Sequence, residues 1–290
     1  MTYARGVSLV ICAAILWSLM ALLIRSLAEA GVWATLFWRS LFLVPVLLAW
    51  LTWTSGGRPL AAVRRAGWPG LVGGAGLVMA FACAIHAIQT TTVANAVFLF
   101  AASPLLAAVI GWAVLGERVR GHTWAAIALA LAGMAVMVRE GLILGGGAGT
   151  VTAVLSALGF AIYTVCLRVG RAGDMLPAVL IGGALSAAVG ALAAGVTGAA
   201  LAVPPADIGI AALMGAGILG IGMTLFTAGS RVVPAVDLTL LSMIEVLLAP
   251  VWALVVLGES ASAATFAGGA VVLAAIAGNA LAGARRRAVA

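Results

Sequence analysis

Two side chains that can carry a charge lie deep within apolar runs of this sequence, Arg39 and Glu245. Glu245 follows the start of its run by about nine residues, or roughly 14 Å along a helix axis. A carboxylate removed from water either takes up a proton or pairs with a cation. Glu245 therefore has two interpretations. It exchanges protons or binds a substrate ammonium group, or it is a protonated glutamate hydrogen-bonded to a neighbouring helix.

Arg39 also has more than one interpretation. Its long side chain can extend along its helix to lipid headgroups, so that only the stem is buried. Alternatively, the guanidinium pairs with the carboxylate of a substrate, or with Glu245 as a structural lock that touches no substrate. The residues alone leave these alternatives open.

Further polar or sulfur-bearing side chains on other apolar runs can complete a binding cavity. The candidates are Met79, His86, Asn95, Ser103, Tyr163 and Thr227. Met79 and His86 share a helix face, since they are seven residues apart. His86 also fits an interfacial histidine, and Asn95 also fits a hydrogen bond between two helices.

Five large apolar residues are candidates for the wall of the cavity: Trp17, Phe98, Leu99, Phe160 and Met243. Each of them also fits packing or lipid contact. A mostly apolar cavity suits a side chain such as Phe, Leu or Met, and it argues against a strongly charged substrate.

The clusters that catalysis or metal binding needs are missing from the sequence. His86 and His122 are expected on opposite sides of a membrane, and no nucleophile, base or metal-ligand set has the required spacing. Gly215, Gly217 and Gly220 spell G-x-G-x-x-G, but no strand precedes them. We therefore expect neither a cofactor, a metal nor an enzyme, and an intramembrane enzyme is only a distant alternative.

The composition is that of an integral membrane protein, because 65% of the 290 residues are hydrophobic and only 8% are charged. The sequence predicts an all-α chain with ten transmembrane helices. They are expected near residues 5–25, 32–53, 67–88, 92–115, 122–138, 150–168, 176–197, 206–231, 235–257 and 261–283.

The arginines predict the orientation of these helices. If both termini are cytoplasmic, twelve of the 15 basic residues face inward and two, Arg25 and Arg139, face outward, with Arg39 inside the membrane. This is the positive-inside distribution. It accounts for the net charge of +7 without a nucleic-acid partner.

A repeat relates the two halves of the chain. Residues 105–117 and 247–259 are identical at eight of thirteen positions, and Ser103 corresponds to Glu245. Five helices is an odd number, so the second copy crosses the membrane in the opposite sense. We predict two inverted five-helix repeats, 1–142 and 143–290, that form one transport unit.

Two details of the repeat carry structural expectations. Glu117 and Glu259 close the fourth and ninth spans, where we expect them to be solvated. Pro104 and Pro250 are expected to kink these two spans at offset levels.

The chain resembles the drug/metabolite transporter superfamily in several features. These are ten short-looped spans in two inverted halves, Leu-Gly-Glu at the ends of spans four and nine, and Trp17 with Arg39. The EamA-type branch is the most similar. One departure is Val246, since family members often have proline directly after the glutamate that corresponds to Glu245. Within that branch, the chain is most similar to bacterial exporters of aromatic and other neutral amino acids.

The resemblance implies a secondary transporter in the bacterial inner membrane that exports neutral or aromatic amino acids through a central cavity by alternating access. Its partners would be this small-molecule substrate and the lipid bilayer, and the chain can act as a monomer, although the oligomeric state is open. Proton exchange and uniport are alternatives for the driving force. Efflux of drugs or of sugar-like or nucleotide-like metabolites is the alternative function, but phosphate groups would call for several basic residues in the cavity.

Overall fold

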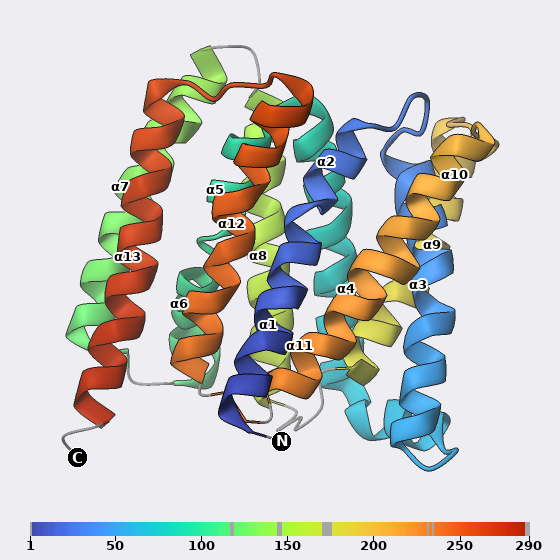
Figure 1. Ribbon diagram of the computed structural model, residues 1–290, viewed down its shortest axis with the longest axis horizontal. Helices are drawn as coiled ribbons and strands as arrows, with labels where there is room; N and C mark the ends of the chain where they lie inside the picture. Colours follow the sequence, from blue (N-terminus) through green and yellow to red (C-terminus); the bar gives the residue numbers. More distant parts are fainter. Residues whose placement is uncertain are drawn as a thin grey trace.

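The computed structural model describes residues 2–116, 119–143, 147–169, 176–230, 232–233 and 235–287, and every regular element in these ranges is a helix (Figure 1). The predicted all-α class is therefore confirmed. The helices run roughly side by side, and α1 begins and α13 ends at the same end of the bundle (Figure 1).

The elements follow the predicted spans closely. They are α1 (Tyr3–Ser18), α2 (Met20–Arg25), α3 (Val32–Thr54), α4 (Pro59–Thr90), α5 (Val93–Phe100), α6 (Ser103–Leu115), α7 (Gly121–Ile143), α8 (Gly147–Val169), α9 (Leu176–Thr197), α10 (Pro205–Ala212), the π-helix η1 (Leu213–Ile221), α11 (Gly222–Ser230), α12 (Ala235–Leu257) and α13 (Ala263–Arg287). Nine spans in the described part are long and apolar enough to cross a membrane, and Leu241–Leu257 adds a shorter apolar helix.

Interruptions within two spans have local causes. Pro104 lies in the first turn of α6, where its missing N–H costs nothing, and the fourth span breaks there into α5 and α6. In the related ninth span, α12 continues through Pro250 as one helix. Gly67 has a φ of 54°, which glycine adopts readily, and it separates a short amphipathic stretch from the membrane-spanning part of α4.

The helices pack in pairs that connect the two predicted repeats. α4 lies against α8 as α1 lies against α11, and α4 lies against α9 as α3 lies against η1. The remaining pairs include α3 with α9 and α7 with α13. If each helix is replaced by its counterpart in the other predicted repeat, the pair α4–α8 becomes α11–α1 and the pair α4–α9 becomes η1–α3. The pairs α3–α9 and α7–α13 are unchanged by this replacement. The inverted relation between the halves stays a prediction, with which this pairing is consistent.

Glycine allows α4 and α8 to approach each other to backbone contact. A Cβ atom at Gly159 would lie 2.6 Å from the Gly76 carbonyl oxygen and 2.7 Å from the Ala80 nitrogen. Just beside this contact, the Ser156 hydroxyl donates a hydrogen bond of 2.8 Å to the Ala80 carbonyl. Small residues promote helix association in a bilayer because apolar side chains gain little there by leaving the lipid.

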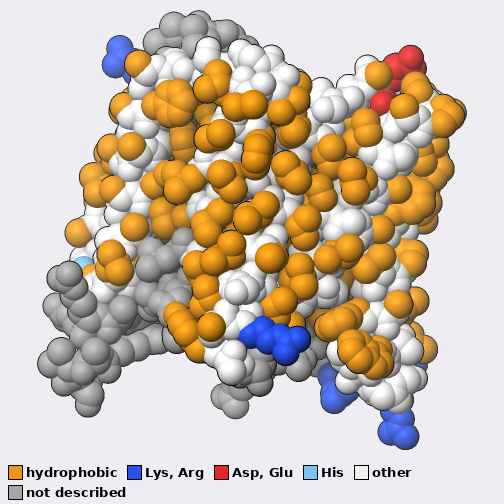
Figure 2. All heavy atoms as spheres, viewed as in Figure 1, with side chains coloured by type: hydrophobic (Ala, Val, Ile, Leu, Met, Phe, Trp, Pro, Cys, Tyr) orange, Lys and Arg blue, Asp and Glu red, His pale blue; other side chains and the backbone are white. Residues whose placement is uncertain are grey.

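The outer surface fits a lipid environment. In the view of Figure 2, hydrophobic side chains cover the middle of the molecule, and the charged side chains drawn lie toward its two ends. Large apolar side chains such as Val196, Leu192 and Leu60 are 88%, 70% and 72% exposed, respectively. The chain is thus a multi-pass membrane protein, although the orientation of its termini remains a prediction.

Replacement of Gly159 by alanine tests the helix contact. We expect Gly159→Ala to lower the free energy of unfolding by about 1–3 kcal/mol, because the new methyl group meets backbone atoms that cannot move aside. Gly195→Ala is the matched control, since a Cβ there has nothing within 4 Å. Thermal unfolding in detergent should show a loss for the first variant and none for the second. Equal unfolding temperatures would contradict the proposed role of the contact.

Candidate functional site

Arg39 lies inside the bundle and does not reach the surface. Only 3% of the residue is exposed, and its guanidinium carbon lies 4.4 Å from the centroid of the Phe81 ring. The interpretation of Arg39 as a side chain that extends to the headgroups is therefore wrong. The close approach of η1 contributes to this burial, because a Cβ at Gly215 would overlap the Arg39 carbonyl.

Phe81 connects Arg39 to an apolar cluster that several spans share. Leu43, Leu47, Leu77 and Tyr163 are fully buried in this cluster, and partly buried aromatic rings pack against it. These rings are Trp17, Trp50, Phe81 and Phe160. Three predicted wall or cavity residues, Trp17, Phe160 and Tyr163, thus meet in one cluster, which we call the Arg39 cluster.

Other predicted site residues lie in a second apolar cluster, where α5 packs against α12 and α13. Phe98 is 5% exposed, Leu99 is 0% exposed, and Met243 packs against the same cluster. A Cβ at Gly269 would overlap the Phe98 ring, so this phenylalanine fills the contact between α5 and α13. Phe98 and Leu99 therefore act in packing, and the structure does not bring them together with Trp17.

Asn95 and His86 make hydrogen bonds to α8. The Asn95 amide donates to Thr150 Oγ1 at 2.9 Å and to Thr91 Oγ1 at 3.1 Å. His86 Nδ1 lies 3.1 Å from Thr152 Oγ1. Both side chains thus join α8 to its neighbours, which is the interhelical role that Asn95 also fitted in the sequence.

The remaining candidates are dispersed over different helices. Met79 on α4 is half-buried, Ser103 is buried at the start of α6, and Thr227 on α11 is 9% exposed. Glu245 on α12 is half-buried. Among the described residues, no ion pair joins Glu245 to Arg39, so the structural lock between these two residues is wrong.

A polar cluster that the sequence did not predict lies at the end of the bundle away from the termini. Arg25 Nη2 lies 3.1 Å from Glu259 Oε2 and donates to the Thr91 carbonyl at 2.5 Å. Glu259 Oε1 accepts a hydrogen bond of 2.5 Å from the Val93 amide. The expectation of a solvated Glu259 is therefore wrong, and Glu117 lies outside the described residues.

Asp207 joins α10 to the turn between α2 and α3. Its carboxylate accepts hydrogen bonds from the amides of Ala28, Glu29 and Ala30 at 3.0, 2.9 and 2.8 Å. Asp207 is 1% exposed, so these three donors replace water around the charge. No apolar run or repeat pointed to this residue. The sequence signal for this role was the position of Asp207 shortly after Pro204 and Pro205, because an acidic residue after proline is typical of the start of a helix.

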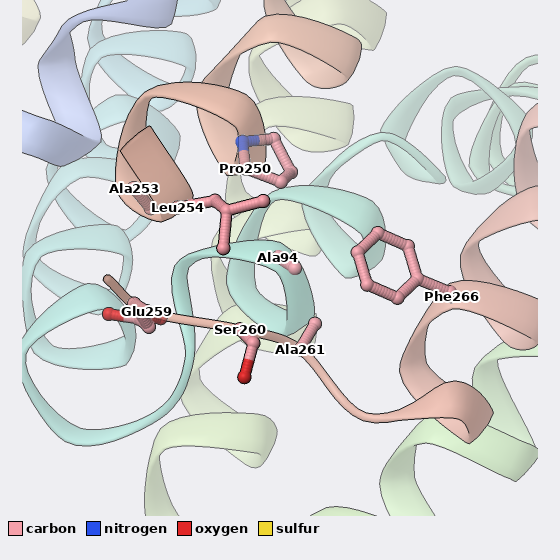
Figure 3. Close-up of a pocket in the computed structure, with 8 residues that line it drawn as sticks. All are labelled: Ala94, Pro250, Ala253, Leu254, Glu259, Ser260, Ala261 and Phe266. Carbon is pink, nitrogen blue, oxygen red and sulfur yellow. The ribbon is translucent and has the colours of Figure 1, made fainter. Parts of the chain in front are cut away.

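Glu259 of the Arg25–Glu259 pair contributes to the lining of a small pocket (Figure 3). No residue of the Arg39 cluster lines this pocket. It is lined by Ala94, Pro250, Ala253, Leu254, Glu259, Ser260, Ala261 and Phe266 and has a volume of about 40 Å³. Ligand pockets usually have several hundred Å³. This pocket therefore cannot hold an amino acid, and it is not the predicted central cavity.

Comparison with known proteins shows which family the sequence is similar to. Residues 4–139 match the model of the EamA-like transporter family. This match supports the predicted drug/metabolite transporter superfamily for the chain.

The structural comparison extends over nearly the whole chain. A solved crystal structure of a protein with 21% sequence identity matches it with a TM-score of 0.66, over 97% of this chain and 98% of the other. At this identity the likeness shows the fold alone. No curated protein matches the chain in sequence.

Residues 4–139 are thus similar to a family of transporters. The described residues contain no group of three or more His, Cys, Asp or Glu side chains that can hold a metal ion. The geometry offers two charged features. One is the buried Arg39 cation beside aromatic rings, and the other is the Arg25–Glu259 ion pair at one end of the bundle.

Asp207→Asn tests the connection between α10 and the turn after α2. An asparagine has one acceptor oxygen, and its NH₂ group would face an amide donor, so we expect the free energy of unfolding to fall by about 1–3 kcal/mol. Glu29→Gln is the matched control, because this exposed carboxylate lies on the same turn. The measurement is thermal unfolding of both variants in detergent. A loss of the same size in both would show that the charge, and not the three hydrogen bonds, matters.

Proposed function

We propose that this chain is a secondary transporter that exports small neutral or aromatic amino acids and related metabolites across the bacterial inner membrane. The EamA-like match is the observation that carries the proposal. The inverted repeat supports alternating access, since two halves of opposite orientation can exchange their conformations and expose a shared site to either side in turn.

The apolar character of the Arg39 cluster supports the substrate class. Its rings come from different spans, Trp17 from α1, Phe81 from α4 and Phe160 from α8. A site formed by these rings can bury an aromatic or aliphatic side chain. Among the described residues, Arg39 is the one buried basic residue, which argues against substrates with several phosphate charges.

Efflux of drugs or of other metabolites is equally consistent with the family match. A site that combines the Arg39 cation with apolar side chains suits a substrate that has both a charged group and an apolar side chain. This favours amino acids over uncharged drugs. For the driving force we propose uniport down the substrate gradient, because few ionisable side chains are buried.

Counterflow in proteoliposomes tests this function. With unlabelled phenylalanine inside, we expect uptake of labelled Phe, Leu and Met, less uptake of labelled Thr because its side chain is small and polar, and no change when a proton gradient is imposed. Empty liposomes are the control. If no neutral amino acid is taken up, the substrate class is wrong and the fold is unaffected. If a gradient increases accumulation, and Glu245→Gln abolishes that increase, transport is coupled to protons.

Alternating access needs a closure at each end, and the Arg25–Glu259 pair is suited to be one of them. The pair joins the end of the first span to the end of the ninth, and Glu259 also holds the start of the fourth span through Val93. The two side chains are only 26% and 19% exposed, so water screens their attraction incompletely. With cytoplasmic termini, this end would face outward, and we propose that the pair closes it.

Glu259→Gln is expected to weaken this closure. The reporter is Ala94→Cys in a chain without Cys12, Cys83 and Cys166, since Ala94 is 3% exposed and lines the pocket beside the pair. We expect the variant to raise the labelling rate by a membrane-impermeant maleimide about tenfold, which corresponds to about 1.4 kcal/mol of lost closure. Glu29→Gln, which removes an exposed charge nearby, should leave the rate unchanged. An unchanged rate in Glu259→Gln would overturn the closure role.

A further inference from the structure

Arg39 forms no ion pair with an acidic side chain among the described residues. It lies about 10 Å along α3 from the start of the helix, well inside the span. Guanidinium groups stay protonated in proteins, so burial does not remove the charge. A charge at this depth is stabilised only by an opposite charge or by hydrogen-bond acceptors.

The described part of the chain supplies Arg39 with neither a full set of acceptors nor an opposite charge. Arg39 Nε and Nη2 are buried, and neither has a hydrogen-bond partner among the described residues. The ion pair found in the described part of the chain joins Arg25 to Glu259 and does not involve Arg39. The Phe81 ring gives a cation–π contact at 4.4 Å, which offsets part of the cost of burial and leaves the N–H groups unsatisfied.

The surroundings define what can satisfy these donors. Trp17 packs against the same cluster as Phe81, and its indole Nε1 is also buried without an acceptor among the described residues. Apolar side chains fill the rest of the cluster, so a ligand that pairs with Arg39 meets rings and aliphatic groups on its other side. A carboxylate has two acceptor oxygens and matches the two-pronged guanidinium.

We propose that Arg39 binds the carboxylate of the transported molecule, and that the Arg39 cluster binds its apolar side chain. This inference rests on the proposed transport function and narrows its substrate class. The substrate is an amphipathic monocarboxylate, and its carboxylate is recognised more strictly than its amino group, because the buried donors Nε and Nη2 of Arg39 have no acceptor among the described residues. Molecules that lack the carboxylate are poor substrates even when their side chain is the same.

Matched ligands test the proposal in the unaltered protein, where no variant can misfold. L-Phenylalanine and 3-phenylpropanoate should each compete with labelled phenylalanine in counterflow. L-Phenylalaninamide and 2-phenylethylamine, which keep the ring and lose the carboxylate, should compete at least about tenfold more weakly. Equal competition by the amide would overturn the proposal and leave the transport function intact.

Variants connect this preference to Arg39. We expect Arg39→Gln to raise the KM for phenylalanine at least about tenfold and to remove the preference for phenylalanine over its amide, whereas Arg39→Lys keeps a weaker preference because the charge remains. Arg64→Gln, at an exposed position on α4, is the control and should behave as the unaltered protein. An Arg39→Gln protein that is folded and still prefers the carboxylate would overturn the assignment.

A binding measurement separates failure of this inference from failure of the proposed function. In detergent, 3-phenylpropanoate should raise the unfolding temperature of the unaltered protein and of Arg64→Gln, and should leave that of Arg39→Gln unchanged. 3-Phenylpropanamide should raise none of them. If this pattern appears without counterflow of any amino acid, Arg39 binds carboxylates and the proposed transport function is wrong. If neither ligand shifts the unaltered protein, the carboxylate site is wrong.

Discussion

Backbone contact between helices, made possible by glycine, is the interaction on which this bundle depends. Lipid tails are as apolar as leucine, so burying leucine side chains between helices gains little in a membrane. At Gly76 and Gly159 the two backbones approach until no Cβ fits between them, and Gly215 allows the same between η1 and α3. Such contacts fix the distances between spans. They also hold Arg39 at a level where no water reaches most of its guanidinium.

Hydropathy predicts the spans of this protein well because length and apolarity are properties of each segment by itself. The predicted span at 235–257 has the bounds of α12, and the predicted start at 67 coincides with the turn at Gly67. Contacts between residues of different spans cannot be predicted from the hydropathy of a single segment. Glu259 looked like a solvated marker of the repeat, since its partner Arg25 lies in a different span and no local pattern connects them.

The candidate site was predicted only in part for the same reason. Types of residue pointed to Arg39, Trp17, Phe160 and Tyr163, which do lie around one cluster. The same reasoning selected Phe98, which fills the contact between α5 and α13, and Leu99, which is buried in the same apolar cluster. In the sequence, an aromatic residue of the Arg39 cluster and one that packs between two helices look the same. Only the neighbouring helices decide the role of the residue. The break of the first span at Leu19 had no sign in the sequence, since no proline or glycine is near it.

The Asp207 carboxylate has a mechanical consequence. Three hydrogen bonds fasten the start of α10 to the turn between α2 and α3, so these segments move as one body. Directly after α10 the chain becomes the π-helix η1, whose turns are wider than those of an α-helix and are frequent at functional sites. Since Gly215 of η1 meets the Arg39 carbonyl, bending of the eighth span at η1 would turn α11 about a point beside the buried cation.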